Sequence, residues 1–208
     1  MSAFATAAAR TGGQAATECV LDAAFRDVPT AGLLWAALPF FEASDLALVL
    51  AEHLRLHFSG AQGEGAVEIV DEVDRYRLVL SPCGSGGALR RRLGVDSKPA
   101  VANRCRQPSN SSWNQTDVPY YCMHCAHNEM HSIDLMGFPR WVTEYTGDPD
   151  KPCGWTIYKD PTGIPQSYFT RLGRTREPSK FRHTGALAGS SKALGTLVGL
   201  IVRRTVGW

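Results

Sequence analysis

The segment "YYCMHCAHNEMHSID", residues 120–134, places two cysteines, three histidines and two acidic residues within fifteen positions. Thiolate and imidazole are the side-chain groups that most often bind zinc in proteins. These residue types are compatible with three outcomes. The segment forms a metal site that does chemistry, a metal site that only stabilises the fold, or a polar helix that binds nothing.

Cys122 and Cys125 form a Cys-x2-Cys motif. Two thiolates at this spacing can converge on one tetrahedral metal at about 2.3 Å each. The same spacing serves redox dithiols, but those usually open a helix after the first strand of a βαβ unit, and no such pattern precedes Cys122. Metal binding is therefore the favoured interpretation. A redox pair and two buried core cysteines are the alternatives.

The remaining ligands depend on the conformation of this segment. In one continuous helix, successive residues turn by about 100°, so the face with the two cysteines and Glu129 lies opposite the histidines. A turn at the cysteines ahead of the helix would instead bring His131 to the same site. His127 and His131 also have the i, i+4 spacing with which one helix face holds zinc. Solvated helix surface is the alternative for each histidine.

Cys83 is the predicted distant ligand. It follows a predicted strand and begins the sequence "CGSGG", whose glycines permit a sharp turn and expose backbone N–H groups. Three protein ligands with an open fourth position are typical of catalytic zinc, and four protein ligands are typical of structural zinc. The predicted metal ligands are Cys83, Cys122 and Cys125, alone or with His131.

Three further cysteines lie outside this motif. Cys153 opens the last predicted strand, where a nearby histidine would lower its pKa and make it a catalytic thiol. A small core residue is the alternative interpretation. Cys19 and Cys105 have no motif around them, so they are predicted to be packing or loop thiols.

Basic and aromatic residues near the cysteines are candidates for binding a substrate. Three arginines, residues 90–92, follow the glycine turn and could hold a carboxylate or phosphate, although a solvated basic helix start is the alternative. Arg90 and Arg140 are the predicted carboxylate ligands. Three aromatic side chains could line the pocket, with strand core as the alternative for at least two of them. These are Trp141, Trp155 and Tyr158.

The hydrophobic pattern predicts an α+β fold, with N-terminal helices packed on a small antiparallel sheet and a Cys/His metal-binding loop-helix inserted. Residues 75–80 alternate as a strand with one buried face. Strands at 140–145 and 154–159 are predicted to form a hairpin, and a short helix to follow at 165–172. Residues 94–119 are predicted to form a long loop.

The predicted organisation has three parts in chain order. Residues 1–16 are predicted to be a disordered lead-in. A single domain follows (17–172), which contains a helical region (17–58) and a region with the sheet and the metal site (66–160). The last part (173–208) is predicted to be a basic segment with a C-terminal amphipathic helix.

Composition excludes several classes of function. The chain has 208 residues, 22 basic and 20 acidic, for a net charge of +2, so no basic footprint for nucleic acid is expected. No segment has the roughly 20 consecutive apolar residues of a membrane span, and no signal peptide is recognisable, which predicts a cytoplasmic protein. Six cysteines are too few for a disulfide scaffold. Association into a homodimer is left open.

Residues 122–159 resemble the C-terminal module of the L-2-amino-thiazoline-4-carboxylic acid hydrolase family. The likeness lies in a cysteine-bearing helix, the sequence "PRWVTEYTGDPDKPCGWTIYK" and a second cysteine at the last strand. The resemblance implies an α+β fold and the hydrolytic opening of a small heterocycle or a related reaction. The matching positions are Cys122 or Cys125, Asp134, the Gly147-Asp148 turn and Cys153.

The leading hypothesis is a zinc-dependent enzyme that acts on a small, carboxylate-bearing molecule by a hydrolase or lyase step. Bound zinc lowers the pKa of a coordinated water to about 7. Glu129, His124 or His127 would shuttle the proton. A non-catalytic zinc-stabilised binding module is the second hypothesis. A non-haem iron redox enzyme, with two histidines and Glu129 as a facial triad, is the third.

Overall fold

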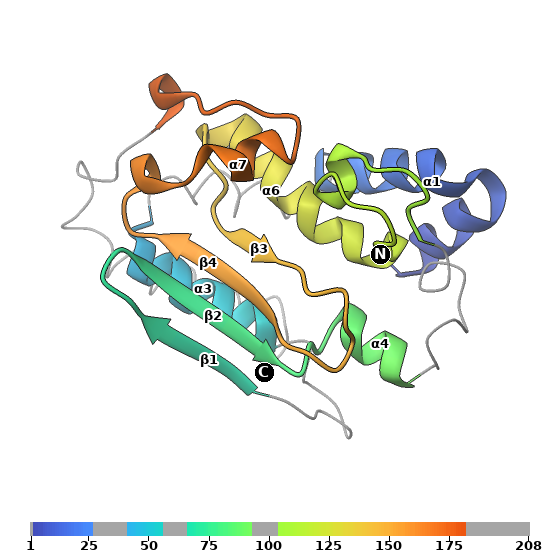
Figure 1. Ribbon diagram of the computed structural model, residues 1–208, viewed down its shortest axis with the longest axis horizontal. Helices are drawn as coiled ribbons and strands as arrows, with labels where there is room; N and C mark the ends of the chain where they lie inside the picture. The colour runs from blue at the N-terminus through green and yellow to red at the C-terminus, as the bar shows by residue number, and fades with distance from the viewer. Residues whose placement is uncertain (1, 27–40, 56–65, 93–103, 182–208) are drawn as a thin grey trace, which may run out of the picture.

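The computed structural model describes residues 2–26, 41–55, 66–92 and 104–181, and it has the predicted α+β architecture (Figure 1). A four-stranded antiparallel sheet is combined with helices that lie against it. Among the described helices, none has the length and apolar character needed to cross a membrane.

The sheet has the strand order β1-β2-β4-β3, and each neighbouring pair is antiparallel. Leu78 and Leu80 are fully buried, which confirms the predicted strand with one buried face. Cys153 is the register partner of Leu80, so the start of β4 lies beside the end of β2. The strands are β1 (Ala66–Asp71), β2 (Arg75–Ser81), β3 (Val142–Glu144) and β4 (Cys153–Tyr158).

Helix α3 (Ala43–Arg55) covers one face of the sheet and contacts β1, β2 and β4 (Figure 1). Its buried residues recur at helical spacing and pack on leucines and Trp155 of the sheet, as the amphipathic pattern predicts. The buried residues of α3 are Leu46, Ala47, Leu50, Ala51 and Leu54.

Helix α1 (Ser2–Arg26) packs beside α6 (Met123–Met136) (Figure 1). Residues 2–16, predicted to be a disordered lead-in, are helical, and Ala8 and Ala9 are buried. This segment is rich in alanine, so its sequence has no periodic pattern of large apolar residues. Alanine is nevertheless the best helix former, and its small side chain allows close packing. Gly13, with a φ of 64°, interrupts the helix with a kink.

Helix α6 is one continuous helix, and its first turn contains Cys125, while Cys122 takes the N-cap position with helical dihedral angles. It lies between two clusters of buried side chains, and Cys125 packs against both. Gly137, with a φ of 82°, ends the helix in the left-handed conformation that favours glycine.

The remaining helices and turns are short. Helix α4 (Gly86–Arg92) follows β2, and α7 (Gln166–Thr170) confirms the predicted short helix. The described part of the predicted long loop, residues 104–119, packs into the core through Trp113 and Val118. The 3₁₀ turns are Asn110–Ser112, Tyr120–Cys122, Pro161–Gly163 and Pro178–Lys180.

The predicted hairpin is present, because β3 and β4 pair in the register Thr143 to Trp155. The predicted C-terminal amphipathic helix lies outside the described residues, and so do parts of the predicted helical region and of the predicted loop.

Candidate thiol site

Four cysteines from three parts of the chain gather at one end of the sheet. Cys83 comes from the turn after β2, Cys153 from the start of β4, and Cys122 and Cys125 from the beginning of α6. The charge of Cys83 acts on each of the other three. Figure 1 shows α4 beside the end of β2 and the start of β4, where this group lies. These four residues are called the thiol cluster below.

Cys83 is the member of the thiol cluster whose environment favours the thiolate. Its sulfur accepts a hydrogen bond from the Gly87 backbone N–H at 3.5 Å. The side chain of Cys153 makes the largest contribution to lowering its pKa. The Ser85 backbone N–H and the charge of Arg91 add to this stabilisation. Together they outweigh burial and lower the pKa of Cys83 to about 6.

Cys153 is the cysteine of the cluster that Cys83 influences most strongly. The neighbouring Cys83 sulfur, followed by burial, raises the pKa of Cys153. The negative charge resides on Cys83 because two backbone N–H groups face that sulfur, whereas Cys153 has one, from Thr146. The pKa of Cys153 thus moves in the direction opposite to the predicted one, and no histidine contributes to its shift.

The Cys-x2-Cys pair consists of protonated thiols. Burial raises the pKa of Cys122 to about 12 and that of Cys125 well above its ordinary value. His124 Nδ1 lies 2.5 Å from the Tyr121 carbonyl oxygen, so this nitrogen carries the proton. The other ring nitrogen, 3.4 Å from the Cys125 sulfur, then accepts from that thiol. Cys125 also accepts a hydrogen bond from Trp155.

The glycine turn lets the backbone of α4 approach two of the cysteines. A Cβ atom on Gly86 would lie 2.7 Å from the Cys122 sulfur, and one on Gly87 would lie 2.7 Å from the Cys83 Cβ. Both distances are shorter than real Cβ contacts. The sequence "CGSGG" is therefore required for close packing as well as for the N–H group that Gly87 donates.

Arg90 and Arg91 connect the loop between β3 and β4 to the region of the thiol cluster by hydrogen bonds. Arg90 donates to the Gly147 carbonyl oxygen at 2.8 Å, and Arg91 donates to the carbonyl oxygens of Cys83, at 3.0 Å, and of Pro149. Arg90 is buried, and its charge acts on Cys122. Arg90 therefore lies beside the predicted site, but its hydrogen bond is to a backbone carbonyl oxygen of the protein.

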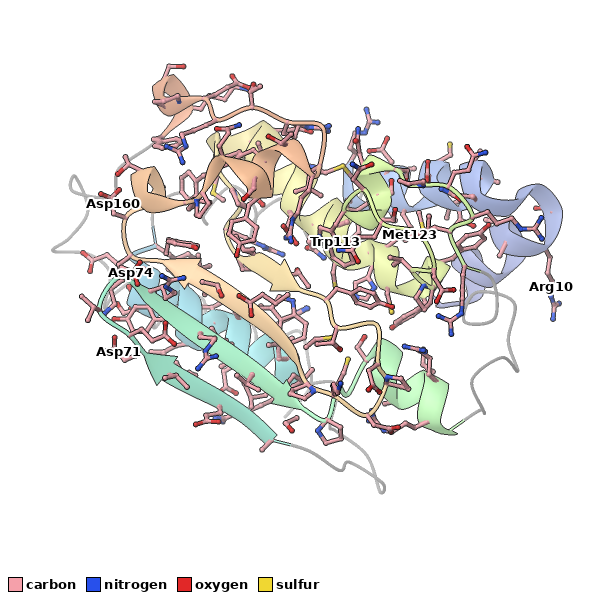
Figure 2. All side chains as sticks on the ribbon, in the orientation of Figure 1. Arg10, Asp71, Asp74, Trp113, Met123 and Asp160 are labelled. Carbon is pink, nitrogen blue, oxygen red and sulfur yellow. The ribbon has the colours of Figure 1, made fainter. Side chains whose placement is uncertain are left out.

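Glu129, the predicted proton shuttle, holds parts of the fold together. Its carboxylate accepts hydrogen bonds from Trp113 Nε1 at 2.8 Å, the Thr143 backbone N–H at 3.0 Å and Arg171 at 2.7 Å. Its side chain has no exposed surface. Figure 2 shows Trp113 beside α6. With three donors and no solvent contact, this carboxylate has the environment of a structural group.

His127 and His131 lie away from the thiols, as one continuous helix requires, whereas His124 contacts the Cys125 sulfur. His131 is nine residues after Cys122, which places the two on opposite faces of the helix. His127 is buried, its ring stacks on Phe25, and burial lowers its pKa to about 4. Burial also lowers the pKa of half-buried His131. In the described part of the chain, no three His, Cys, Asp or Glu side chains are arranged so that they could hold a metal ion.

The other predicted substrate residues separate into one that contacts the thiol cluster and several that do not. The Trp155 side chain acts on Cys125 and opposes the rise of its pKa. Buried Arg140 lies over the Trp141 ring, 3.7 Å from its centroid, and donates to Asn128. Tyr158, at the far end of β4, accepts a hydrogen bond from Arg75. Asp134, named by the resemblance, is paired with Arg174 on the surface.

Sequence reasoning missed two tyrosines at the site. Tyr121 shares a hydrogen bond of 3.3 Å with Ser85, beside the turn that holds Cys83. The ring of Tyr145 stacks on Trp113, and its buried hydroxyl has no hydrogen-bond partner among the described residues. Burial raises the pKa of Tyr145, and Cys122 and Cys153 add smaller contributions in the same direction. Tyr121 directly precedes Cys122, so the sequence alone could have placed it at the site. Tyr145 has no spacing to the cysteines that would predict its position.

Comparison of the chain with protein families, with curated proteins and with solved structures finds no match.

Proposed function

We propose that the protein is a cysteine-dependent enzyme that acts on a small molecule, with the Cys83 thiolate as nucleophile. The observation that supports this proposal is the Gly87 backbone N–H, which donates to the Cys83 sulfur at 3.5 Å. Cys153, Ser85 and Arg91 also contribute to lowering the pKa of Cys83. A thiolate is a far better nucleophile than a thiol, and a buried sulfur surrounded by donors is the arrangement that produces one at neutral pH.

The proposed reaction begins with attack of the Cys83 sulfur on an electrophilic carbon of the C=O or C=N type. A bond between sulfur and carbon forms, the leaving group departs with the electrons of its bond, and water then hydrolyses the covalent intermediate. The Cys153 thiol is positioned to return a hydrogen bond to the sulfur when the thiolate is regenerated. Such a sequence yields the hydrolytic outcome that the family resemblance implies.

Arg90 supports an anionic substrate as the preferred class. It is buried, its charge acts on Cys122, and its Nε atom has no hydrogen-bond partner among the described residues. A buried guanidinium N–H without a partner is costly, and a carboxylate oxygen would satisfy it.

The proposal is tested with p-nitrophenyl acetate, an activated ester that reports thiolate attack by release of p-nitrophenolate. The wild-type protein is expected to release a burst of one equivalent and to carry an acetyl group on Cys83, detected by mass spectrometry. Cys83→Ser should lose the burst, and Cys19→Ser, which alters an exposed cysteine outside the site, should keep it. Acetylation of Cys122, Cys125 or Cys153 in place of Cys83 would contradict the proposal.

The zinc centre predicted from the sequence, and its iron alternative, stay predictions. The described side chains do not form a group that could hold a metal ion, so no step of the proposed reaction is assigned to one. Elemental analysis of the purified protein tests both metals directly. About one equivalent of zinc, lost in Cys83→Ser, would favour the metal-dependent enzyme over the thiolate nucleophile.

A further inference from the structure

Arg90 is a buried cation that lacks an acidic partner among the described residues. Only 6% of its surface is exposed, and none of the ion pairs in the described part of the chain includes it. Its Nη1 atom donates to the Gly147 carbonyl oxygen at 2.8 Å, whereas its buried Nε atom has no hydrogen-bond partner there. A neutral carbonyl does not balance a buried charge, so an anion at Nε would remove a substantial cost.

Tyr145 supplies a second buried donor without an acceptor. Its hydroxyl oxygen is buried and has no hydrogen-bond partner among the described residues, although the side chain as a whole is only half-buried. The ring stacks on Trp113 with the centroids 5.4 Å apart, which fixes the direction of the hydroxyl. Burial raises the pKa of Tyr145, so the hydroxyl keeps its proton at neutral pH and can donate it to an acceptor.

The two donors lie beside the same residue, Gly147. Arg90 bonds to the carbonyl oxygen of Gly147, and a Cβ atom on Gly147 would lie 3.8 Å from Cε1 of Tyr145, the ring carbon next to the one that bears the hydroxyl. The charge of Arg90 also acts on Tyr145 and opposes the rise of its pKa. A guanidinium N–H and a phenol O–H, both without acceptors, thus come from two segments that meet at one glycine.

Hydrogen bonds of Arg91 connect this place to the turn that holds Cys83. Arg91 donates to the Cys83 carbonyl oxygen at 3.0 Å and also to the Pro149 carbonyl oxygen, in the loop that follows Tyr145. Figure 1 shows this loop, between β3 and β4, running beside α4. The two donors therefore lie next to the proposed nucleophile, where they could hold the non-reacting end of a small substrate.

We propose that Arg90 and Tyr145 form a carboxylate subsite, in which the Arg90 Nε–H and the Tyr145 hydroxyl donate to the oxygens of a small monocarboxylate. The inference rests on the proposed function, since it specifies how the anionic substrate is bound. It adds Tyr145 as a specificity-determining residue. Hydrogen bonds in which one partner is charged are the stronger class, so both donors contribute to affinity.

The charge at this place favours a carboxylate over a phosphate. A phosphate monoester carries about 1.5 to 2 negative charges at pH 7, whereas a carboxylate carries one, which a single guanidinium balances. The neighbouring arginines already have partners. Arg91 is bonded to two backbone carbonyl oxygens, and Arg104 is paired with Asp117. One uncompensated buried charge therefore matches one carboxylate.

The experiment titrates acetate into the full-length protein at an ionic strength held constant with sodium chloride. The readout is the NMR signal of the Arg90 Nε–H group, assigned by its loss in Arg90→Lys. The expected result is a saturable shift of this signal. Tyr145→Phe keeps the ring and removes the hydroxyl, so it should weaken acetate binding by about tenfold or more. Tyr76→Phe, whose ring contacts Lys159 outside the subsite, should bind acetate as the wild type does.

Titration of the wild type decides whether the subsite exists, so the test does not depend on the folding of a variant. No saturable shift with acetate, or an equal shift with the neutral analogue acetamide, would overturn the subsite. Tighter binding of inorganic phosphate than of acetate would overturn the carboxylate assignment. Equal acetate affinity in Tyr145→Phe and the wild type would overturn the role of Tyr145.

The subsite and the proposed nucleophile fail separately, because acetate binding requires no reaction at sulfur. Acetate binding without the ester burst at Cys83 refutes the nucleophile only. The burst without acetate binding refutes the subsite only.

Discussion

At the scale of single residues, the account depends on which sulfur carries the negative charge. Four cysteines of the same chemical type differ only in their surroundings. Burial, followed by the charges of neighbouring groups, raises the pKa values of Cys122 and Cys125, whereas the surroundings of Cys83 reverse the effect of burial. Cys153 contributes most to this difference, and residues 85–87, whose backbone approaches the Cys83 sulfur closely, add to it.

Cys153→Ala is expected to raise the pKa of Cys83, because the Cys153 thiol is the largest contributor to its lowering. A higher pKa leaves less thiolate, so alkylation of Cys83 by iodoacetamide at pH 7 should slow several-fold. Cys153→Ser, which keeps a hydroxyl donor, should lie between the alanine variant and the wild type. An unchanged rate in the alanine variant would show that Cys153 does not stabilise the thiolate.

At the scale of elements, α6 has two different faces, and the sequence pattern identified both. Its beginning supplies two cysteines to the thiol cluster, and its buried Glu129 joins α6 to β3, to Trp113 and to Arg171. The opposite face packs on α1 through His127. The helix therefore positions the site chiefly by connecting several segments that are distant in the chain.

Glu129→Ala is expected to lower the free energy of unfolding by about 3–5 kcal/mol, since it leaves two buried donors and the partly buried Arg171 charge without their acceptor. Asp134→Ala is the matched control, because Asp134 is an exposed carboxylate of the same helix paired with Arg174. This variant should cost less than about 1 kcal/mol. Urea denaturation measures both. Equal effects would contradict a structural role for Glu129.

His127→Phe is expected to remove part of the acid sensitivity of the protein. In the folded state burial lowers the pKa of His127 to about 4, below the ordinary histidine value of 6.5, so the unfolded state binds the extra proton between these pH values. Stability is then lost as the pH falls from 6.5 to 4, by up to about 1.4 kcal/mol per pH unit. The phenylalanine variant should lack this contribution in urea titrations across that range. Parallel pH profiles would argue against a buried, neutral His127.

At the scale of the whole molecule, the sequence predicted the elements better than the contacts between them. Alternating Leu78 and Leu80 identified β2, and helical spacing identified α3, because one buried face dictates each pattern. The approach of Cys83 to Cys153 depends on strand order, which no local pattern encodes. The continuous helix at Cys122 also decided against His131 as a shared ligand, an alternative that spacing alone had left open.

The thiolate at Cys83 is a property of the folded chain, since strand β2, strand β4 and helix α4 bring its donors together. The most direct test is the rate of Cys83 alkylation by iodoacetamide as a function of pH, followed by peptide mapping in native protein and in urea. The pH midpoint of the alkylation rate is expected near pH 6 in the native protein and at about 8.5 in urea, where the thiol is unperturbed. A native midpoint equal to that in urea would contradict a thiolate at Cys83.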